Sequence, residues 1–195
     1  MEQNELFTAP QRLPEGFVHR AEFIPPGEEA RLLDSISALD FRHASYRQWT
    51  ARRRIVSFGG SYDFTHNKLH PAEAVPAFLH GLRERIAEWA GVPGHEFAQA
   101  NIAEYPAGTP LGWHRDVPDF EIVAGVSLKG MARMRFRPYP PAEGWTRAIL
   151  YLDLAPRSAY IIRDAARWQW QHSISPTKEL RYSITFRTLR QPPTR

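Results

Sequence analysis

Apolar residues recur along the chain with two different periods, and the period changes about halfway along. After Pro26, Leu32 and Ile36 keep the spacing of one helix face, and two glutamates stand where the positive end of the helix favours them. A second helix is predicted from Pro76, and it should end at a turn rich in glycine and proline. Residues 1–97 are therefore expected to hold helices and loops.

From residue 98 onward, short segments alternate apolar and polar positions, and proline and glycine separate them. Eight segments have the length and the bounding residues of strands. They are residues 98–105, 112–116, 121–128, 132–137, 147–154, 158–163, 168–174 and 180–189. Such a series favours an antiparallel barrel or jelly roll, against which the helices would pack on one side. We therefore predict an α+β, mainly β fold, in a single domain over residues 1–195 with its jelly-roll core at 98–190.

The composition limits the chemistry that this domain can carry out. The chain has 195 residues, of which 43% are hydrophobic and 24% charged, as in a soluble domain with a sizeable core. It contains no cysteine, which excludes disulfides, zinc–thiolate sites, iron–sulfur clusters and thiol catalysis. A transition metal would have to bind histidine and carboxylate side chains. We expect a cytoplasmic protein, because no signal-like N-terminus and no apolar run of about 20 residues is present.

The net charge of +4 is unevenly spread. No acidic residue lies between Asp40 and Asp63, and a second basic stretch follows residue 128. The first stretch contains Arg42, Arg47, Arg52, Arg53 and Arg54, and the second contains Lys129, Arg133, Arg135 and Arg137. Arginine-rich patches of this kind are candidate phosphate contacts. The alternative is a solvated basic face that binds no partner.

The segment GWHRDVPDF contains a His-x-Asp pair that suits a metal site. If it lies on the expected strand, His114 and Asp116 project from one face and Arg115 from the other. His172, on a late strand, is the natural third ligand, because a jelly roll can bring distant strands together. Two histidines and one carboxylate are the ligand set of non-haem iron(II) oxygenases, which keep positions open for cosubstrate and O₂. We predict His114, Asp116 and His172 as metal ligands and catalytic centre.

The C-terminal segment LRYSITFRTLR separates polar from apolar side chains on a strand. Its polar face carries Arg181, Ser183, Thr185 and Arg187. Two guanidinium groups would be costly to bury without partners, so an anion is expected beside them. Arg181 and Arg187 are about 20 Å apart along an extended strand, and a short dicarboxylate could bind with one carboxylate on each. The alternative is an edge strand with solvated arginines.

Together these residues resemble the AlkB family of Fe(II)/2-oxoglutarate dioxygenases. The resemblance covers roughly residues 50–190 and rests on the ordered series Tyr105-x-x-Gly108, His114-x-Asp116, His172 and Arg181 with Arg187. Family similarity implies a double-stranded β-helix (jelly roll) with N-terminal helices packed against one side, and the cofactors Fe(II), 2-oxoglutarate and O₂. It also implies that Tyr105 and Arg181 hold the distal carboxylate of 2-oxoglutarate, while Arg187 supports its metal-bound end.

Two positions depart from the family pattern. Ala103 stands where the family usually has asparagine, and Asn101 precedes it by two residues. Ser183 stands where some members have asparagine, and we keep it among the expected cosubstrate-binding residues. One hydrogen bond to the cosubstrate is therefore expected to be missing or replaced.

The segment RRRIVSFGGSYDF resembles the part of the family that runs over the substrate mouth, which makes residues 1–97 a helical and substrate-lid region. Tyr62 and Phe64 match an aromatic pair that contacts the substrate nucleotide, and a flipped base could stack between Phe64 and His114. The expected phosphate contacts are Arg52, Arg53 and Arg54. The alternative is that Phe64 belongs to the core and that the arginines are only solvated.

The function that this resemblance implies is oxidative demethylation of N-alkylated bases in DNA or RNA, an alkylation damage repair reaction that releases formaldehyde, succinate and CO₂. The expected partner is alkylated DNA or RNA. No membrane and no partner protein is expected, and a monomer is the default. One alternative is the same chemistry on a tRNA modification or a protein side chain. The other is a catalytically inactive jelly-roll binding module.

Overall fold

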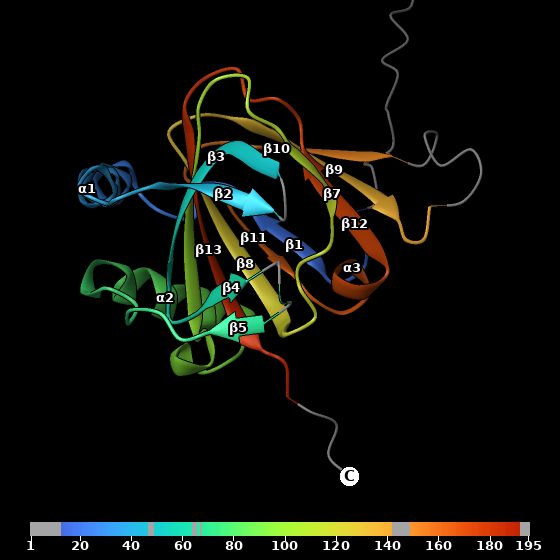
Figure 1. The fold of residues 1–195 in the computed structure, drawn as a ribbon, viewed down its shortest axis with the longest axis horizontal. Helices are drawn as coiled ribbons and strands as arrows, with labels where there is room; N and C mark the ends of the chain where they lie inside the picture. The colour runs from blue at the N-terminus through green and yellow to red at the C-terminus, as the bar shows by residue number, and fades with distance from the viewer. Residues whose placement is uncertain (1–12, 47–48, 64–65, 67, 142–148, 192–195) are drawn as a thin grey trace, which may run out of the picture.

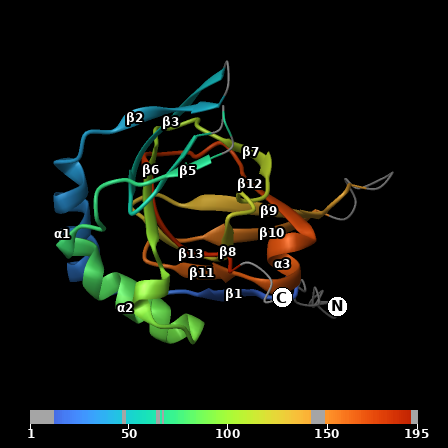
Figure 2. The ribbon, with the colours of Figure 1, turned by 60° about the horizontal axis from the view of Figure 1, so that its bottom comes forward.

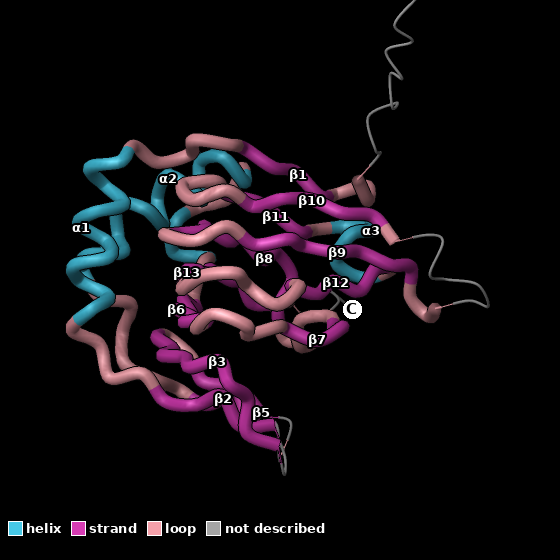
Figure 3. The backbone as a smooth tube through the Cα atoms, turned by 90° about the horizontal axis from the view of Figure 1, so that it is seen from above, coloured by secondary structure: helices cyan, strands magenta, loops and turns pink. Residues whose placement is uncertain are grey.

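The computed structural model in Figure 1 describes residues 13–46, 49–63, 66, 68–141 and 149–191. Two antiparallel sheets form a sandwich, and two helices cover one side of it (Figures 1 and 3). The strands are β1 (Phe17–Arg20), β2 (Arg42–Tyr46), β3 (Trp49–Phe58), β4 (Ser61–Asp63), β5 (Lys68–His70), β6 (Gln99–Tyr105), β7 (Leu111–His114), β8 (Phe120–Leu128), β9 (Ala132–Pro138), β10 (Leu150–Leu154), β11 (Ala159–Ile162), β12 (Trp170–Ile174) and β13 (Arg181–Leu189). The helices are α1 (Pro26–Ser37), α2 (His80–Ala90) and α3 (Asp164–Trp168), with 3-10 turns η1 (Ala77–Leu79) and η2 (Gly94–Glu96).

The larger sheet has seven strands in the order β1-β11-β8-β13-β6-β3-β2. Its central strand β13 alternates as its sequence predicts. Ile184 and Phe186 lie in a core cluster with Leu32 and Ile36 of α1 and with Ile86 of α2. The opposite face of β13 therefore points into the sandwich and carries its polar side chains.

The smaller sheet has the order β10-β9-β12-β7, so β7 is an edge strand (Figure 2). Met134 and Phe136 of β9 and Ile174 of β12 are buried against Val123 and Ile162 of the larger sheet. This second cluster fills the space between the sheets. Because side chains alternate along a strand, the other face of the smaller sheet carries the polar residues of β9 and β10.

The mainly β jelly-roll fold is confirmed, and all eight predicted strands are present. Strands β1, β2 and β3, which precede residue 98, also belong to the larger sheet. Strand β7 ends at His114, so Asp116 lies in the loop that follows and not on the strand as predicted. Among the described residues, no helix is long and apolar enough to cross a membrane.

Candidate metal and cosubstrate site

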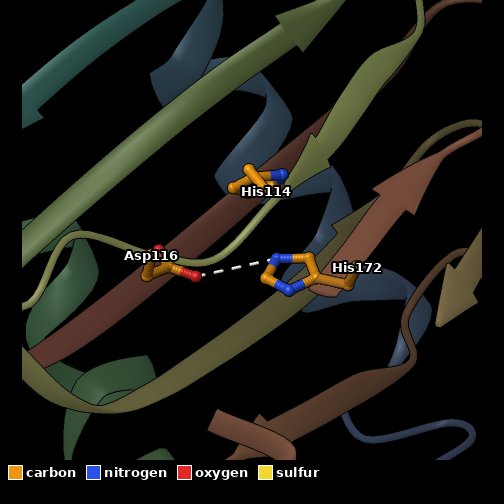
Figure 4. Close-up of side chains that lie close together, drawn as sticks. All are labelled: His114, Asp116 and His172. Carbon is orange, nitrogen blue, oxygen red and sulfur yellow. Dashed lines mark ion pairs between the residues drawn. The ribbon is translucent and has the colours of Figure 1, made fainter. Parts of the chain in front are cut away.

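His114, Asp116 and His172 converge on the inner side of the smaller sheet (Figure 4). The antiparallel pairing of β7 with β12 sets His114 opposite His172, and their ring centroids are 4.2 Å apart. One ligand atom from each of the three residues lies within 4.8 Å of the other two. The loop after β7 brings Asp116 to the same point, with its Oδ2 atom 3.6 Å from Nε2 of His172. The chain thus places two imidazoles and one carboxylate around a single point, as the sequence predicts.

The neighbours of these three groups hold them in the state that binds a divalent metal. The Nδ1 atom of His114 lies 2.9 Å from the carbonyl oxygen of Gly112, which leaves Nε2 of His114 available as a ligand. Nε of Arg187 donates to Oδ1 of Asp116 at 2.8 Å and orients that carboxylate. Arg187 also donates to Oε1 of Gln99 at 2.9 Å. Metal ligands commonly have such supporting hydrogen bonds, so the donor set fits the metal.

The charge states of the triad also suit metal binding. Burial, together with the neighbouring His114, lowers the pKa of His172 to about 3. Burial also lowers the pKa of His114. Burial by itself would raise the pKa of Asp116, but the Arg187 guanidinium holds that pKa well below its usual range. At neutral pH both histidines are therefore neutral and the aspartate is ionised, which are the ligand forms that bind metal.

Arg181 lies on the inner face of the larger sheet, which faces the smaller sheet, and is only 1% exposed. Its Nε donates to Oγ of Ser127 at 3.0 Å, and its Cζ lies 5.0 Å from the centroid of the Tyr105 ring. Within the described part of the chain, Arg181 forms no ion pair. A buried guanidinium without an ion pair is costly, so the surroundings of Arg181 and Tyr105 fit an anionic ligand.

Arg53 also lies beside Tyr105, although the sequence suggested a role on phosphates. Its Cζ lies 5.9 Å from the centroid of the Tyr105 ring, and its Nε is buried without a hydrogen-bond partner among the described residues. Burial by itself would raise the pKa of the Tyr105 phenol, but Arg53 and Arg181 lower it by charge and by hydrogen bonding. Two guanidiniums from different strands therefore flank one phenol.

The Arg187 guanidinium is ion-paired with Asp116 at 2.8 Å, so it supports a candidate metal ligand. Ser183 is 5% exposed and pairs in register with Ser127 of β8 and Ala103 of β6.

The residues predicted to contact the substrate differ in their exposure and in their partners. Arg54 donates through Nε and an Nη atom to the two carboxylate oxygens of Glu104, at 2.7 and 2.9 Å. It is therefore engaged in an internal ion pair. Arg52 is exposed beside the turn at Gly108, and Tyr62 is half-buried on β4. Phe64 lies outside the described residues.

Sequence reasoning did not identify the contacts that Gln99, Ser127 and Arg53 make with Arg187, Arg181 and Tyr105. Gln99 links Arg187 to the backbone, since its Nε2 donates to the carbonyl oxygen of Gly60 at 3.0 Å. Asn101 shares the inner face with Gln99, and its Oδ1 is buried without a partner among the described residues. The only available signal was the alternation along β6, which puts Gln99, Asn101 and Tyr105 on one face.

Comparison with known proteins gives a consistent picture. The profile of the 2OG-Fe(II) oxygenase superfamily matches residues 26–187. An uncharacterised protein of Acanthamoeba polyphaga mimivirus is 35% identical over 187 residues, which cover 89% of this chain and 85% of the viral protein. The tRNA (carboxymethyluridine(34)-5-O)-methyltransferase ALKBH8 of Mus musculus is 27% identical over 86% of this chain, and the match spans only 25% of the mouse protein. The Alkylated DNA repair protein ALKBH8 homolog of Arabidopsis thaliana is 27% identical over 78% of this chain and 49% of its own length.

Solved structures share the fold at low sequence identity. The structure of OsALKBH1 superposes with a TM-score of 0.71 at 14% identity, covering 91% of this chain and 99% of the other. A Pseudomonas putida prolyl-4-hydroxylase gives a TM-score of 0.58 at 13% identity, covering 91% and 94%. From the profile match and these relatives, the chain belongs to the 2OG-Fe(II) oxygenase superfamily, as an AlkB-like dioxygenase that uses iron(II), 2-oxoglutarate and O₂.

Proposed function

We propose that this dioxygenase oxidatively demethylates N-alkylated bases in DNA or RNA, releasing formaldehyde, succinate and CO₂. The observation that carries the proposal is the convergence of His114, Asp116 and His172, together with the buried guanidinium of Arg181, which has no ion pair among the described residues. The mouse and Arabidopsis relatives, whose names refer to tRNA and to alkylated DNA, support a nucleic-acid substrate.

His114, Asp116 and His172 would hold the iron, with His114 binding through Nε2 and Asp116 through the oxygen that faces His172. Bound iron, 2-oxoglutarate and O₂ supply the oxidising chemistry, while the protein positions the C–H bond. Arg187 keeps one oxygen of Asp116 occupied and thereby fixes the orientation of its carboxylate. The neutral imidazoles need not lose a proton before they bind metal.

Tyr105 and Arg181 would hold the distal carboxylate of 2-oxoglutarate, with Ser127 orienting Arg181. Arg53 would bind the same carboxylate, because its guanidinium lies on the same phenol ring. Ser183, on the inner face beside Ser127, would complete the floor of this subsite. A dianionic cosubstrate would balance the buried guanidinium of Arg181 and the half-buried guanidinium of Arg53.

The substrate would approach beside the segment that joins β3 to β5. Tyr62 and Phe64 would contact the target base, and Arg52 would contact a phosphate because it is exposed. Arg53 and Arg54 are less suited to phosphate, since Arg54 is paired with Glu104 and Arg53 lies on Tyr105.

A second candidate keeps the chemistry and places it on a modified tRNA base. The name of the mouse relative favours it, although that match covers only a quarter of the mouse protein. Both candidates require the same metal and cosubstrate residues, so only the substrate separates them.

The test is a panel of single- and double-stranded DNA and RNA oligonucleotides with N-methylated bases, plus unfractionated tRNA, incubated with iron(II) and 2-oxoglutarate. Mass spectrometry should show loss of a methyl group from at least one oligonucleotide, with formaldehyde and succinate in equal amounts. The His114→Ala variant should produce neither. Oxygen added to tRNA without any methyl loss in the oligonucleotides would favour the second candidate. Succinate production with no change in any nucleic acid would contradict both.

A further inference from the structure

The outer face of the smaller sheet carries a row of arginines that the proposed reaction does not use. Along β9, Ala132, Met134 and Phe136 are buried in the core, and the alternate positions point outward. Those outward positions are Arg133, Arg135 and Arg137, which form the second basic stretch of the sequence.

Two of these arginines are fixed in place by an aromatic ring and by neutral side chains. Trp113 lies within 5.0 Å of the Cζ of Arg135 and 4.6 Å of the Cζ of Arg137, measured from its ring centroid. The Nε of Arg135 donates to Oγ of Ser173 at 3.0 Å, and the Nε of Arg137 donates to Oε1 of Gln171 at 2.7 Å. Stacking and the Nε hydrogen bond together preorganise each guanidinium, so less entropy is lost when it binds a ligand.

A second arginine–aromatic pair lies just beyond the end of β7. The Cζ of Arg115 is 3.8 Å from the centroid of the Tyr139 ring, and Arg115 donates to the carbonyl oxygen of Trp168 at 2.9 Å. Tyr139 is 41% exposed, so this pair is open to solvent.

The charge of this face is positive and only partly balanced. Asp153 is bound by Arg133 through two hydrogen bonds of 2.7 and 2.9 Å. Within the described part of the chain, Arg115 and Arg135 form no ion pair. Preorganised guanidiniums interleaved with aromatic rings suit a strand with regular phosphates and stackable bases, which is single-stranded nucleic acid.

We propose that Trp113, Arg115, Arg133, Arg135, Arg137 and Tyr139 form a platform that binds the backbone of single-stranded nucleic acid on one side of the reacting base. The platform reaches the metal site around an edge, because β7 is the edge strand and carries Trp113 outward next to His114 inward. A nucleic-acid strand that follows this edge would pass from the platform to the metal site. The choice of nucleic acid as partner rests on the proposed function, and the binding itself does not depend on the reaction.

The test measures binding of an unmodified, fluorescently labelled 20-nucleotide single strand to the full, Mn(II)-loaded protein by anisotropy. The variant is Arg135→Gln with Arg137→Gln, which removes two charges from the platform. The matched control is Arg31→Gln with Arg85→Gln, which removes two charges from α1 and α2 across the molecule. Thermal unfolding and substrate-free turnover of 2-oxoglutarate check that both variants are folded and active.

We expect the platform variant to bind about tenfold more weakly than wild type. The slope of log K against log salt should fall by about 1.4, or about 0.7 for each phosphate that the protein no longer neutralises. The control should change neither quantity. Equal reductions of affinity in the two double variants, or an unchanged affinity in the platform variant, would overturn the proposal.

Photocrosslinking of wild-type protein to a strand that carries 4-thiouridine gives a readout without substitutions. Crosslinked peptides should contain Trp113 or Tyr139, and crosslinks confined to the β4–β5 hairpin would overturn the platform.

If demethylation occurs but the platform variant binds normally, only the platform fails. If platform-dependent binding persists but no methyl group is removed, only the proposed reaction fails.

Discussion

Replacing Arg53 tests whether 2-oxoglutarate binds to the two guanidiniums that flank Tyr105. Arg53 reaches Tyr105 from β3, and Arg181 reaches it from β13. In Arg53→Gln the buried phenol keeps one guanidinium neighbour, and a carboxylate bound there loses one charged hydrogen bond. Such a bond contributes about 1.5–3 kcal/mol. Arg53 is only half-buried, so the lower end of that range applies, which corresponds to a dissociation constant about tenfold higher.

Titration calorimetry of 2-oxoglutarate into the Mn(II)-loaded protein measures this constant directly, without turnover. Arg52→Gln is the matched control, because the neighbouring residue points to the other face of β3 and is exposed. Arg181→Gln should weaken binding by more than about a hundredfold, since Arg181 is fully buried and its charged hydrogen bond is at the upper end of the range or beyond.

The reasoning is refuted if Arg53→Gln binds 2-oxoglutarate as tightly as wild type while it binds oligonucleotides more weakly. Arg53 would then serve the nucleic acid, as the sequence first suggested. A reduction of both affinities would leave the cosubstrate role intact and add a second one.

Three further outcomes follow from the same geometry. Arg187→Met should lower Mn(II) affinity about 10- to 100-fold in EPR titrations, because Asp116 loses the group that orients it, and an unchanged affinity would contradict that role. Arg54→Met should reduce the free energy of unfolding in urea by about 1–3 kcal/mol, because it leaves the buried Glu104 carboxylate without its main partner, and a smaller reduction in Arg42→Met is the control. The metal-free protein should lose stability as pH falls from about 6.5 towards 3. In that range His172 takes up a proton in the unfolded chain but stays neutral in the folded protein, where its pKa is about 3. This pH dependence of the unfolding free energy should weaken in His172→Leu.

The local pattern was sufficient to predict the strands that supply the site. The eight segments from residue 98 onward have the length of strands and turn residues between them, so their positions could be inferred, and the segment of β13 also alternates polar and apolar side chains. The same alternation put Arg181 and Ser183 on the interior face of β13, where the structure has them. Chain order alone suggested His172 as the partner of His114, and the β7–β12 pairing confirms that they are adjacent.

The roles of the arginines on β3 could not be inferred in this way. Adjacent residues of a strand face opposite sides, but the sequence does not say which side is the interior. The register of β3 against β6 decides it, since it sets Arg54 against Glu104 and leaves Arg53 facing Tyr105. Pairing between strands that are distant in sequence depends on the whole sheet. For the same reason β1, β2 and β3 were not foreseen as members of the larger sheet.

The contacts of Arg53 and Gln99 also bear on how the cosubstrate pocket and the β4–β5 hairpin depend on each other. One contact runs from Tyr105 to Arg53 on β3, and the other runs from Asp116 through Arg187 and Gln99 to the carbonyl oxygen of Gly60. Gly60 lies in the segment that leads from β3 into the hairpin, and Arg53 lies further back on β3. That segment turns where only glycine fits, because Gly59 has a φ of +74° and a Cβ there would collide with the backbone of Ala98, just before β6. The start of the hairpin is therefore linked to the candidate metal ligand Asp116 through Gln99 and Arg187, while Arg53 links the preceding strand β3 to Tyr105.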